Sequence, residues 1–295
     1  MLSLLFFVPI VPVIIAVVVI TMVVSLTGSG RVRPLTPEAR RASLSAGLSL
    51  ALSVGFAFIA AAWLITTDEL GRGILLAGPV FVLVIQLGLA AATTIISTAI
   101  RSSGDVRMAA LGTRRAADSA PRFLTAATGV GVAAAFAILF IACIVADIDR
   151  GTSEYRAFTH LRNDGSVSTF APFAGSFYSG PLAITLAISI VTTVVTLIGA
   201  QRWGALDHLE FDVTLRLGIS VRTVAGTAMT AALILVLVGA STSQAAFEMS
   251  DSPDDTVWWL LGRIGFPTAA AFGLGLGAWA LLAFLAPALG RRLRS

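Results

Sequence analysis

A short acidic run around the second histidine has the clearest capacity for chemistry in this sequence. Six consecutive positions contain Asp207, His208, Glu210 and Asp212. Carboxylates and an imidazole so close together could hold a metal ion or transfer protons. On a helix, however, only His208 and Asp212 share a face, because they are four positions apart. Two ligands make a weak zinc site, so we expect no metal ion here.

The other reactive side chains also argue against enzymatic chemistry. Cys143 is the single cysteine, so no disulfide can form within the chain, and in its apolar run a thiol acts as a small hydrophobic group. His160 and His208 fall in loops that the topology below places on opposite sides of a bilayer, so they cannot share a metal or a haem. The sequence has no nucleophile-elbow motif. We expect no catalytic residues and no cofactor.

Two glycine-rich stretches are better explained by helix packing than by phosphate binding. One contains Gly129 and Gly131, and the other runs from Gly273 to Gly277. Neither precedes a Lys-Ser or Lys-Thr pair, and both lie in apolar segments that no strand precedes, so the phosphate-loop context is missing. Gly273 and Gly277 are four positions apart, a spacing that lets membrane helices approach closely. We predict that these two glycines pack against another helix.

The composition indicates a protein that lies mostly in lipid. Of the 295 residues, 57% are hydrophobic and 12% are charged, whereas a soluble domain has about 25% charged residues. The 20 basic residues are all arginine. No compact basic domain presents them, so we expect no nucleic-acid binding. The sequence predicts a single integral membrane domain over residues 1–295.

Seven segments are long and apolar enough to cross a bilayer, which requires about 20 apolar residues per helix. They are residues 4–26, 44–66, 74–100, 123–146, 181–200, 219–240 and 266–289. The first has no positive charge at its amino end and is too long for a signal peptide, so we read it as a retained span. The predicted fold is an all-α, polytopic bundle of about seven transmembrane helices.

The distribution of arginine predicts the orientation of this bundle. The loops after the first, third and fifth spans and the carboxyl-terminal tail hold most of the arginines, whereas the alternate loops are acidic or balanced. Basic loops face the cytoplasm. We therefore expect the amino terminus outside, the carboxyl terminus inside, and a multi-pass location in the plasma membrane.

Three loops contain local signals. Thr36-Pro37 is typical of a helix start, with proline at the first helical position. Leucine and valine at helical spacing over residues 206–217 predict a short amphipathic helix that ends at Gly218. In the loop over residues 147–178, two strand-like runs flank Asn163-Asp164-Gly165. An Asp-Gly pair between such runs predicts a small external β-hairpin, held down by aromatic residues between Phe170 and Tyr178.

Ionisable side chains are missing from the middle of the predicted spans, and this argues against a proton- or sodium-coupled pump. Gln86 is the main strongly polar side chain at that depth, and we interpret it as an interhelical hydrogen-bonding group. Six arginines at the predicted cytoplasmic side could contact anionic lipid or an acidic partner, although charge topology alone explains arginine there. They are Arg107, Arg114, Arg115, Arg122, Arg216 and Arg222.

Three patterns resemble a group of multi-pass membrane proteins of actinobacteria. They are the basic loop Arg107-x6-Arg114-Arg115-x6-Arg122, the run Phe173-x-Gly175-x2-Tyr178-x2-Pro181 and the loop Asp212-x3-Arg216-x5-Arg222. The resemblance covers the central half of the chain and implies a plasma-membrane location, but no activity and no catalytic residues.

Two functional classes remain open from the sequence. The first is a transport-related or accessory membrane subunit, acting with a cytoplasmic partner or as a homo-oligomer. It is favoured by an apparent repetition of the third and fourth spans in the fifth and sixth, although membrane helices of similar composition would also look alike. The second is a signalling or sensing scaffold that reads a cue through its external loop and reports it through its arginine-rich loops.

Overall fold

The computed structural model of the chain describes residues 37–67, 70–101, 121–161, 167–202, 209–249 and 260–287. Six helices in these ranges are long and apolar enough to cross a membrane. They correspond to six of the seven predicted spans, and the predicted span at 4–26 lies outside the described residues. Arg107, Arg114 and Arg115 also lie outside them.

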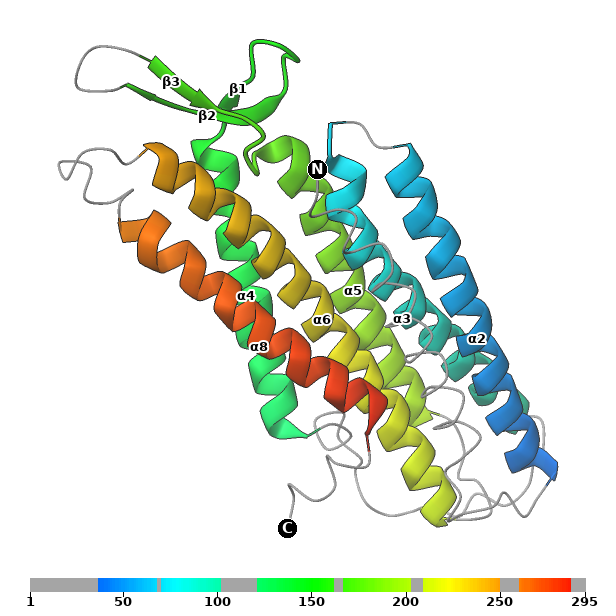
Figure 1. Cartoon of the computed structure of the whole chain (residues 1–295). Coiled ribbons are helices and arrows are strands. Elements are labelled where there is room, and N and C mark those ends of the chain that lie inside the picture. Colours follow the sequence, from blue (N-terminus) through cyan, green and yellow to red (C-terminus); the bar gives the residue numbers. More distant parts are fainter. Residues whose placement is uncertain are drawn as a thin grey trace.

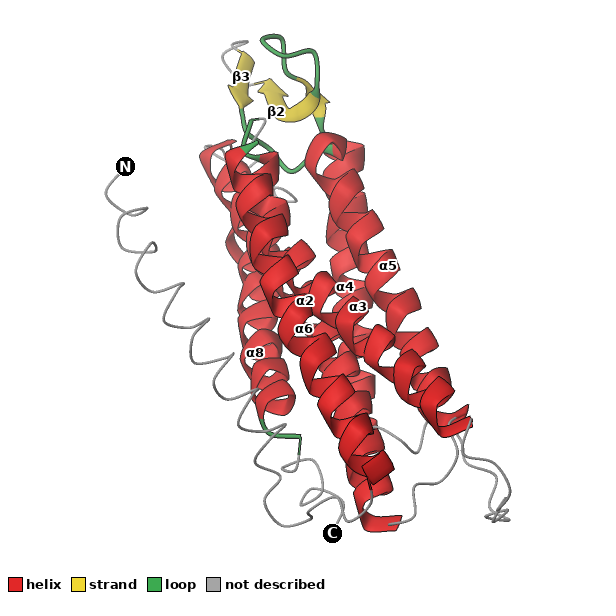
Figure 2. Ribbon diagram, turned by 90° about the vertical axis from the view of Figure 1, so that its right-hand side faces the viewer, coloured by secondary structure: helices red, strands yellow, loops and turns green. Residues whose placement is uncertain are grey.

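The helices form one elongated antiparallel bundle (Figures 1 and 2). The bundle consists of α2 (Pro37–Thr66), α3 (Arg72–Arg101), α4 (Arg122–Val145), α5 (Ser176–Arg202), α6 (Leu209–Met249) and α8 (Phe266–Leu285). A short π-helical turn, η2 (Leu261–Gly265), leads into α8. Strands β1 (Asp147–Ile148), β2 (Tyr155–Leu161) and β3 (Val167–Phe170) cap one end of the bundle.

The two ends of the bundle differ in what they carry. We call the end with the strands the sheet end. The other end, where α2, α4 and α6 begin and α3, α5 and α8 finish, is the arginine end (Figure 1). Arg40, Arg122 and Arg216 lie near it.

Helix α6 is the central element of the bundle, in contact with α3, α4, α5 and α8. In its apolar stretch 72% of the residues are buried, against 22% to 44% in the other five helices. Small residues make this possible, because Ala225, Gly226 and Ala228 let neighbouring backbones come close to α6. Helix α2 lies at the periphery and packs on α3, where a Cβ at Gly88 would overlap Ser53.

Glycines bring α8 against α6. A Cβ added to Gly273 would lie 2.9 Å from the carbonyl oxygen of Ala232, and one added to Gly277 would lie 3.3 Å from the Cβ of Ala232. From the α6 side, a Cβ at Gly239 would be 3.2 Å from the carbonyl oxygen of Phe266. Both glycines for which the sequence predicts helix packing therefore face α6, and they set how closely the two helices approach.

Pro267, which follows the π-helical turn η2, limits the hydrogen bonds that this turn can make. In a π-helix each carbonyl accepts from the N–H five residues later, and for Gly262 that residue is proline, which has no N–H. The hydroxyl of Ser243 on α6 donates instead to the carbonyl oxygen of Gly262 at 2.8 Å. A side chain of α6 thus satisfies a backbone group that the sequence of η2 leaves without a donor.

The predicted helix start at Thr36-Pro37 lies at the edge of the described residues, and α6 corrects another prediction. Helix α2 is described from Pro37 onward, and Thr36 lies outside the described residues. The predicted short helix ending at Gly218 is wrong, since α6 runs unbroken from Leu209 through that glycine. Glycine in a helix interior costs about 1 kcal/mol, but here Asp212 and Arg216 form an ion pair one turn earlier and Ile219 is buried directly after it. These contacts hold Gly218 inside the helix.

The predicted β-hairpin is confirmed in its strands. β2 and β3 pair antiparallel, with Phe158 opposite Phe170 and Leu161 opposite Val167; the turn at 163–165 lies outside the described residues. The two-residue strand β1, which the sequence reading missed, pairs with the start of β2. Phe158 stacks on Phe173 with ring centroids 5.3 Å apart, so the expected aromatic anchoring is present.

Candidate functional site

The most distinctive internal feature is a buried polar cluster at the middle of the bundle. It joins Gln86 of α3, Ser189 and Thr193 of α5, and Thr223 and Thr227 of α6, and we call it the Gln86 cluster. Gln86 lies at the middle of α3 and is 0% exposed, as is Ser189. Three helices therefore meet around one amide group at the depth where polar groups are most costly in lipid.

We call the Gln86 cluster closed because every donor in it has an acceptor, either within the cluster or, for the Thr223 hydroxyl, at the Ile219 carbonyl of its own helix. The Gln86 amide nitrogen donates at 3.0 Å both to the carbonyl oxygen of Thr223 and to the hydroxyl of Thr227. The Ser189 hydroxyl donates to the Gln86 amide oxygen at 2.7 Å. The hydroxyls of Thr193 and Thr227 are 2.7 Å apart, and Thr193 also reaches the Thr223 carbonyl oxygen at 3.3 Å.

Gly226 makes room for this arrangement. A Cβ at Gly226 would lie 2.6 Å from Cγ of Gln86 and 2.7 Å from its amide nitrogen. The interhelical hydrogen bond predicted for Gln86 is confirmed, but its partners were missed. The signal that could have found them is the spacing, since Ser189 and Thr193, like Thr223 and Thr227, are four positions apart on one helix face. The cluster contains only neutral groups, so it offers hydrogen bonding but no general acid or base.

Helices α5 and α6 meet in a regular antiparallel register, which we call the α5–α6 seam. Arg216 of α6 donates to the carbonyl oxygen of Ala200 of α5 at 2.8 Å. Further in, Thr193 contacts Thr223, and Ser189 contacts Thr227 at 3.1 Å. From the first of these contacts to the next, the chain advances seven residues on each helix, and the last step is four on each. The register is therefore constant from the arginine end to the cluster.

At the arginine end, two of the predicted contact residues point into the protein. Arg216 forms an ion pair with Asp212 at 2.8 Å, and the Asp212 side chain is 1% exposed. Arg222 is 6% exposed and donates to the carbonyl oxygen of Phe284, in the last turn of α8, at 3.2 Å. Since Arg216 and Arg222 donate to carbonyls at the ends of α5 and α8, their charges act favourably on those helix dipoles.

Arg122 differs from Arg216 and Arg222, because it is exposed at the first residue of α4. No side chain caps this helix start, which follows Pro121. Of the six arginines for which the sequence predicts contact with lipid or a partner, Arg122 is thus the described one that faces outward. That contact stays a prediction for all six.

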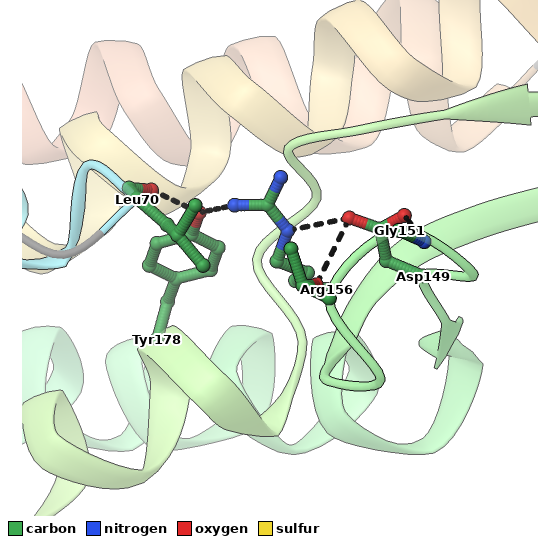
Figure 3. A network of polar contacts seen from close by, with 6 residues as sticks. Leu70, Asp149, Gly151, Arg156 and Tyr178 are labelled. Atoms are coloured by element: carbon green, nitrogen blue, oxygen red, sulfur yellow. Dashed lines mark hydrogen bonds and ion pairs between the residues drawn. The ribbon is translucent and has the colours of Figure 1, made fainter.

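At the sheet end, a chain of polar contacts ties the strands to three helices (Figure 3). Arg156 of β2 donates to the Asp149 carboxylate at 2.8 Å and to the Tyr178 hydroxyl at 3.2 Å. The Tyr178 hydroxyl, at the start of α5, donates in turn to the carbonyl oxygen of Leu70 at 2.6 Å. Leu70 lies in the turn between α2 and α3 with a left-handed φ of 58°.

In this series of contacts, Asp149 and Arg156 each stabilise the charged form of the other. The hydrogen bond from Arg156, followed by the one from the Gly151 N–H, lowers the pKa of Asp149 below its ordinary value. The same bond raises the pKa of Arg156. The ion pair is therefore fully charged at neutral pH, and it fixes the strands to the helix ends rather than leaving them on a free loop.

The structure brings together no group suited to metal binding in the ranges that it describes: no three side chains of His, Cys, Asp or Glu are close enough to hold an ion. His208 lies outside those ranges. The chain matches no protein-family model, no curated protein and no solved structure. The function must therefore be argued from the bundle itself.

Proposed function

We propose that the protein is a multi-pass plasma-membrane protein that acts as a non-conducting accessory subunit, with its arginine end in the cytoplasm. The observation that supports this most directly is the closed Gln86 cluster. A carrier site needs polar groups that are free to receive a solute, usually near the middle of the bilayer. In the Gln86 cluster these groups are used up by each other.

The surrounding packing supports the same proposal. Beyond the cluster toward the sheet end, α5 and α6 bury Leu182, Leu186 and Ile234, all at 0% exposure and in one apolar cluster. Alanine and glycine fill the contacts of α6 with α3 and α8. An interior packed this closely suits a protein that holds a position in an assembly rather than one that opens a path.

Accessibility of single cysteines tests the proposal. In a Cys143→Ala background, Ser189→Cys and Thr227→Cys should not react with a membrane-impermeant thiol reagent applied from either side of sealed vesicles. Thr169→Cys, exposed on β3, should react from one side and serves as the positive control. Reaction at position 189 or 227 would show that solute can reach the cluster, which would favour a carrier.

The proposal that an acidic partner or anionic lipid binds the arginine end depends on Arg122 and on the arginines of the preceding loop. Arg122→Glu places a negative charge at the start of α4, where the helix dipole favours it, so the variant should fold at least as well as the wild type. Loss of a co-purifying protein or of bound anionic phospholipid, measured by native mass spectrometry, would therefore report a lost contact. Unchanged co-purification would leave Arg122 with a topological role alone.

A sensing scaffold is the second candidate, and the Tyr178 hydroxyl is the observation that favours it. It connects β2, through Arg156, to the turn that joins α2 and α3. Tyr178→Phe removes this connection with little change in volume. If the strands report to the arginine end, the variant should alter hydrogen exchange at residues 209–218, whereas the exposed control Thr169→Val should not. Exchange that changes only around the strands would count against sensing.

A further inference from the structure

Ser220 is the starting point, because its hydroxyl is buried and has no partner. Among the side chains that the structure describes, it is the buried oxygen or nitrogen atom without a hydrogen bond, and Ser220 is 0% exposed. The neighbouring buried threonines on α6 behave differently: Thr223 donates to the Ile219 carbonyl and Thr230 to the Gly226 carbonyl. A buried hydroxyl without a partner is costly, and a bound water is one way in which proteins satisfy such a group.

The register of the α5–α6 seam shows what Ser220 faces. From the Ala200–Arg216 contact, one step of four residues on each helix pairs Thr196 with Ser220. A step of three then reaches the observed contact between Thr193 and Thr223. Thr196 is 1% exposed and donates to its own helix at the Thr192 carbonyl, 2.7 Å away. Its oxygen keeps lone pairs that can accept a further hydrogen bond.

The charges next to this layer select the kind of ligand. Arg216, one helical turn from Ser220, disfavours a cation in the same low-dielectric space. Asp212 already pairs with Arg216, so an anion would compete with a carboxylate that is nearly completely buried. A small neutral molecule with both donors and acceptors meets neither obstacle. We propose that the Thr196–Ser220 layer holds a buried water molecule, which donates to Thr196 and accepts from Ser220.

This water would make the polar layers of the seam continuous. They would run from the Arg216–Asp212 pair through Thr196 and Ser220 to the Gln86 cluster. The distance from Arg216 to Thr227 along α6 is eleven residues, or about 16 Å, roughly half of a bilayer core of about 30 Å. The next layers toward the sheet end bury leucine and isoleucine at Leu182, Leu186 and Ile234. These apolar side chains favour entry of water into the seam from the arginine end rather than from the sheet end.

Thiol exchange with heavy water tests the proposal with a probe hardly larger than the serine hydroxyl. In the Cys143→Ala background, Ser220→Cys and Ile234→Cys place a thiol at two positions of α6 that are both 0% exposed. The S–H stretch is followed by infrared spectroscopy after transfer of the protein in lipid to D₂O. The thiol at position 220 should exchange about tenfold faster or more than the one at 234, because water is its direct neighbour.

A second variant separates a bound water from general loosening of the helix. Thr196→Val keeps the shape of the threonine but removes the acceptor opposite position 220. Combined with Ser220→Cys, it should slow exchange of that thiol, whereas exchange of the thiol in Ile234→Cys should stay the same. Equal rates at 220 and 234 in the starting background would overturn the proposal. That outcome means that Ser220 turns to bond the carbonyl of its own helix, and the layer is dry. The proposed accessory function would survive this result, since it depends on the cysteines at 189 and 227.

Discussion

At the scale of single residues, the buried amide of Gln86 shows how neighbouring helices satisfy a polar group inside the bundle. Gln86 is held by hydroxyls and a carbonyl from two other helices, and Gly226 leaves the space that its amide needs. Hydrogen bonds between membrane helices contribute about 0.6 kcal/mol each on average. Their main effect here is geometric, since one amide fixes the register of α3, α5 and α6.

The fit between Gly226 and Gln86 leads to a first prediction. Gly226→Ala should destabilise the protein by about 1–3 kcal/mol, the usual cost of overpacking a close-packed interior. Thermal or denaturant unfolding in detergent would measure it. The matched control is Gly129→Ala on α4, where a Cβ meets nothing within 4 Å; it should be neutral or slightly stabilising, because alanine favours helix. Equal effects of the two variants would contradict the close approach of α3 and α6.

Asp149 predicts how the sheet end responds to acid. Its pKa is lower in the folded protein than its ordinary value of 3.8, so the carboxylate stabilises the folded state at pH values above that point. This contribution is lost as the pH falls through the folded-state pKa. The melting temperature of the wild type should therefore drop in the acid range below 3.8, with a slope that Asp149→Asn reduces. Thr169→Val, an exposed and non-titratable position on β3, is the control that should retain the slope.

At the scale of elements, the helices depend on each other to satisfy their backbones. The carbonyl of Gly262 in η2 receives its hydrogen bond from Ser243 of α6, and the carbonyls of Ala200 and Phe284 receive theirs from Arg216 and Arg222. Three carbonyls at helix ends and in η2 therefore accept a hydrogen bond from a neighbouring helix, and α6 supplies all three donors.

Removing one such contact gives the third prediction. Ser243→Ala should cost about 1–2 kcal/mol, because the Gly262 carbonyl is left buried without a donor. Ser241→Ala is the matched control, since the Ser241 hydroxyl bonds only to the Val238 carbonyl of its own helix, and its loss should cost less. Unfolding of the two variants under identical detergent conditions gives the comparison. If Ser241→Ala were the more damaging of the two, the role given to Ser243 would be wrong.

The same elements show how far a sequence reading extends. Hydropathy identifies the described spans because their apolar stretches exceed the bilayer thickness, and the Asp-Gly signal predicts β2 and β3 because the turn chemistry is local. The prediction that a helix ends at Gly218 failed because the ion pair of Asp212 with Arg216 and the burial of Ile219 outweigh the tendency of glycine to end a helix. The partners of Gln86 were missed because threonine and serine also bond their own helices, and only the tertiary register decides which do so.

At the scale of the whole molecule, the bundle is asymmetric in three ways. Its sheet end is held by Tyr178 and Arg156, its arginine end carries the guanidinium groups of Arg216 and Arg222, and the hydrogen bonds described between α5 and α6 lie in the half of the seam next to that end. These differences distinguish the two ends, and the proposal that the arginine end is cytoplasmic rests on the concentration of basic residues in its loops.

The fourth prediction concerns this orientation. Reporter fusions at the carboxyl terminus should show cytoplasmic activity, and fusions at the amino terminus should show activity outside. A reporter inserted after Gly151, in the loop between β1 and β2, should also be active outside. A cytoplasmic signal from that insertion would invert the topology and with it the side from which water is proposed to enter.

The length of α6 has one more consequence. Its 41 residues extend about 60 Å, roughly twice the thickness of a bilayer core of about 30 Å, without a break. A helix of this length is long enough to extend beyond the bilayer core. Helix α5 contacts it at Arg216, Thr223 and Thr227, at steps of seven and then four residues. Unbroken helical backbone therefore joins Arg216, which contacts α5 near one end, to Ser243, which contacts η2 near the other.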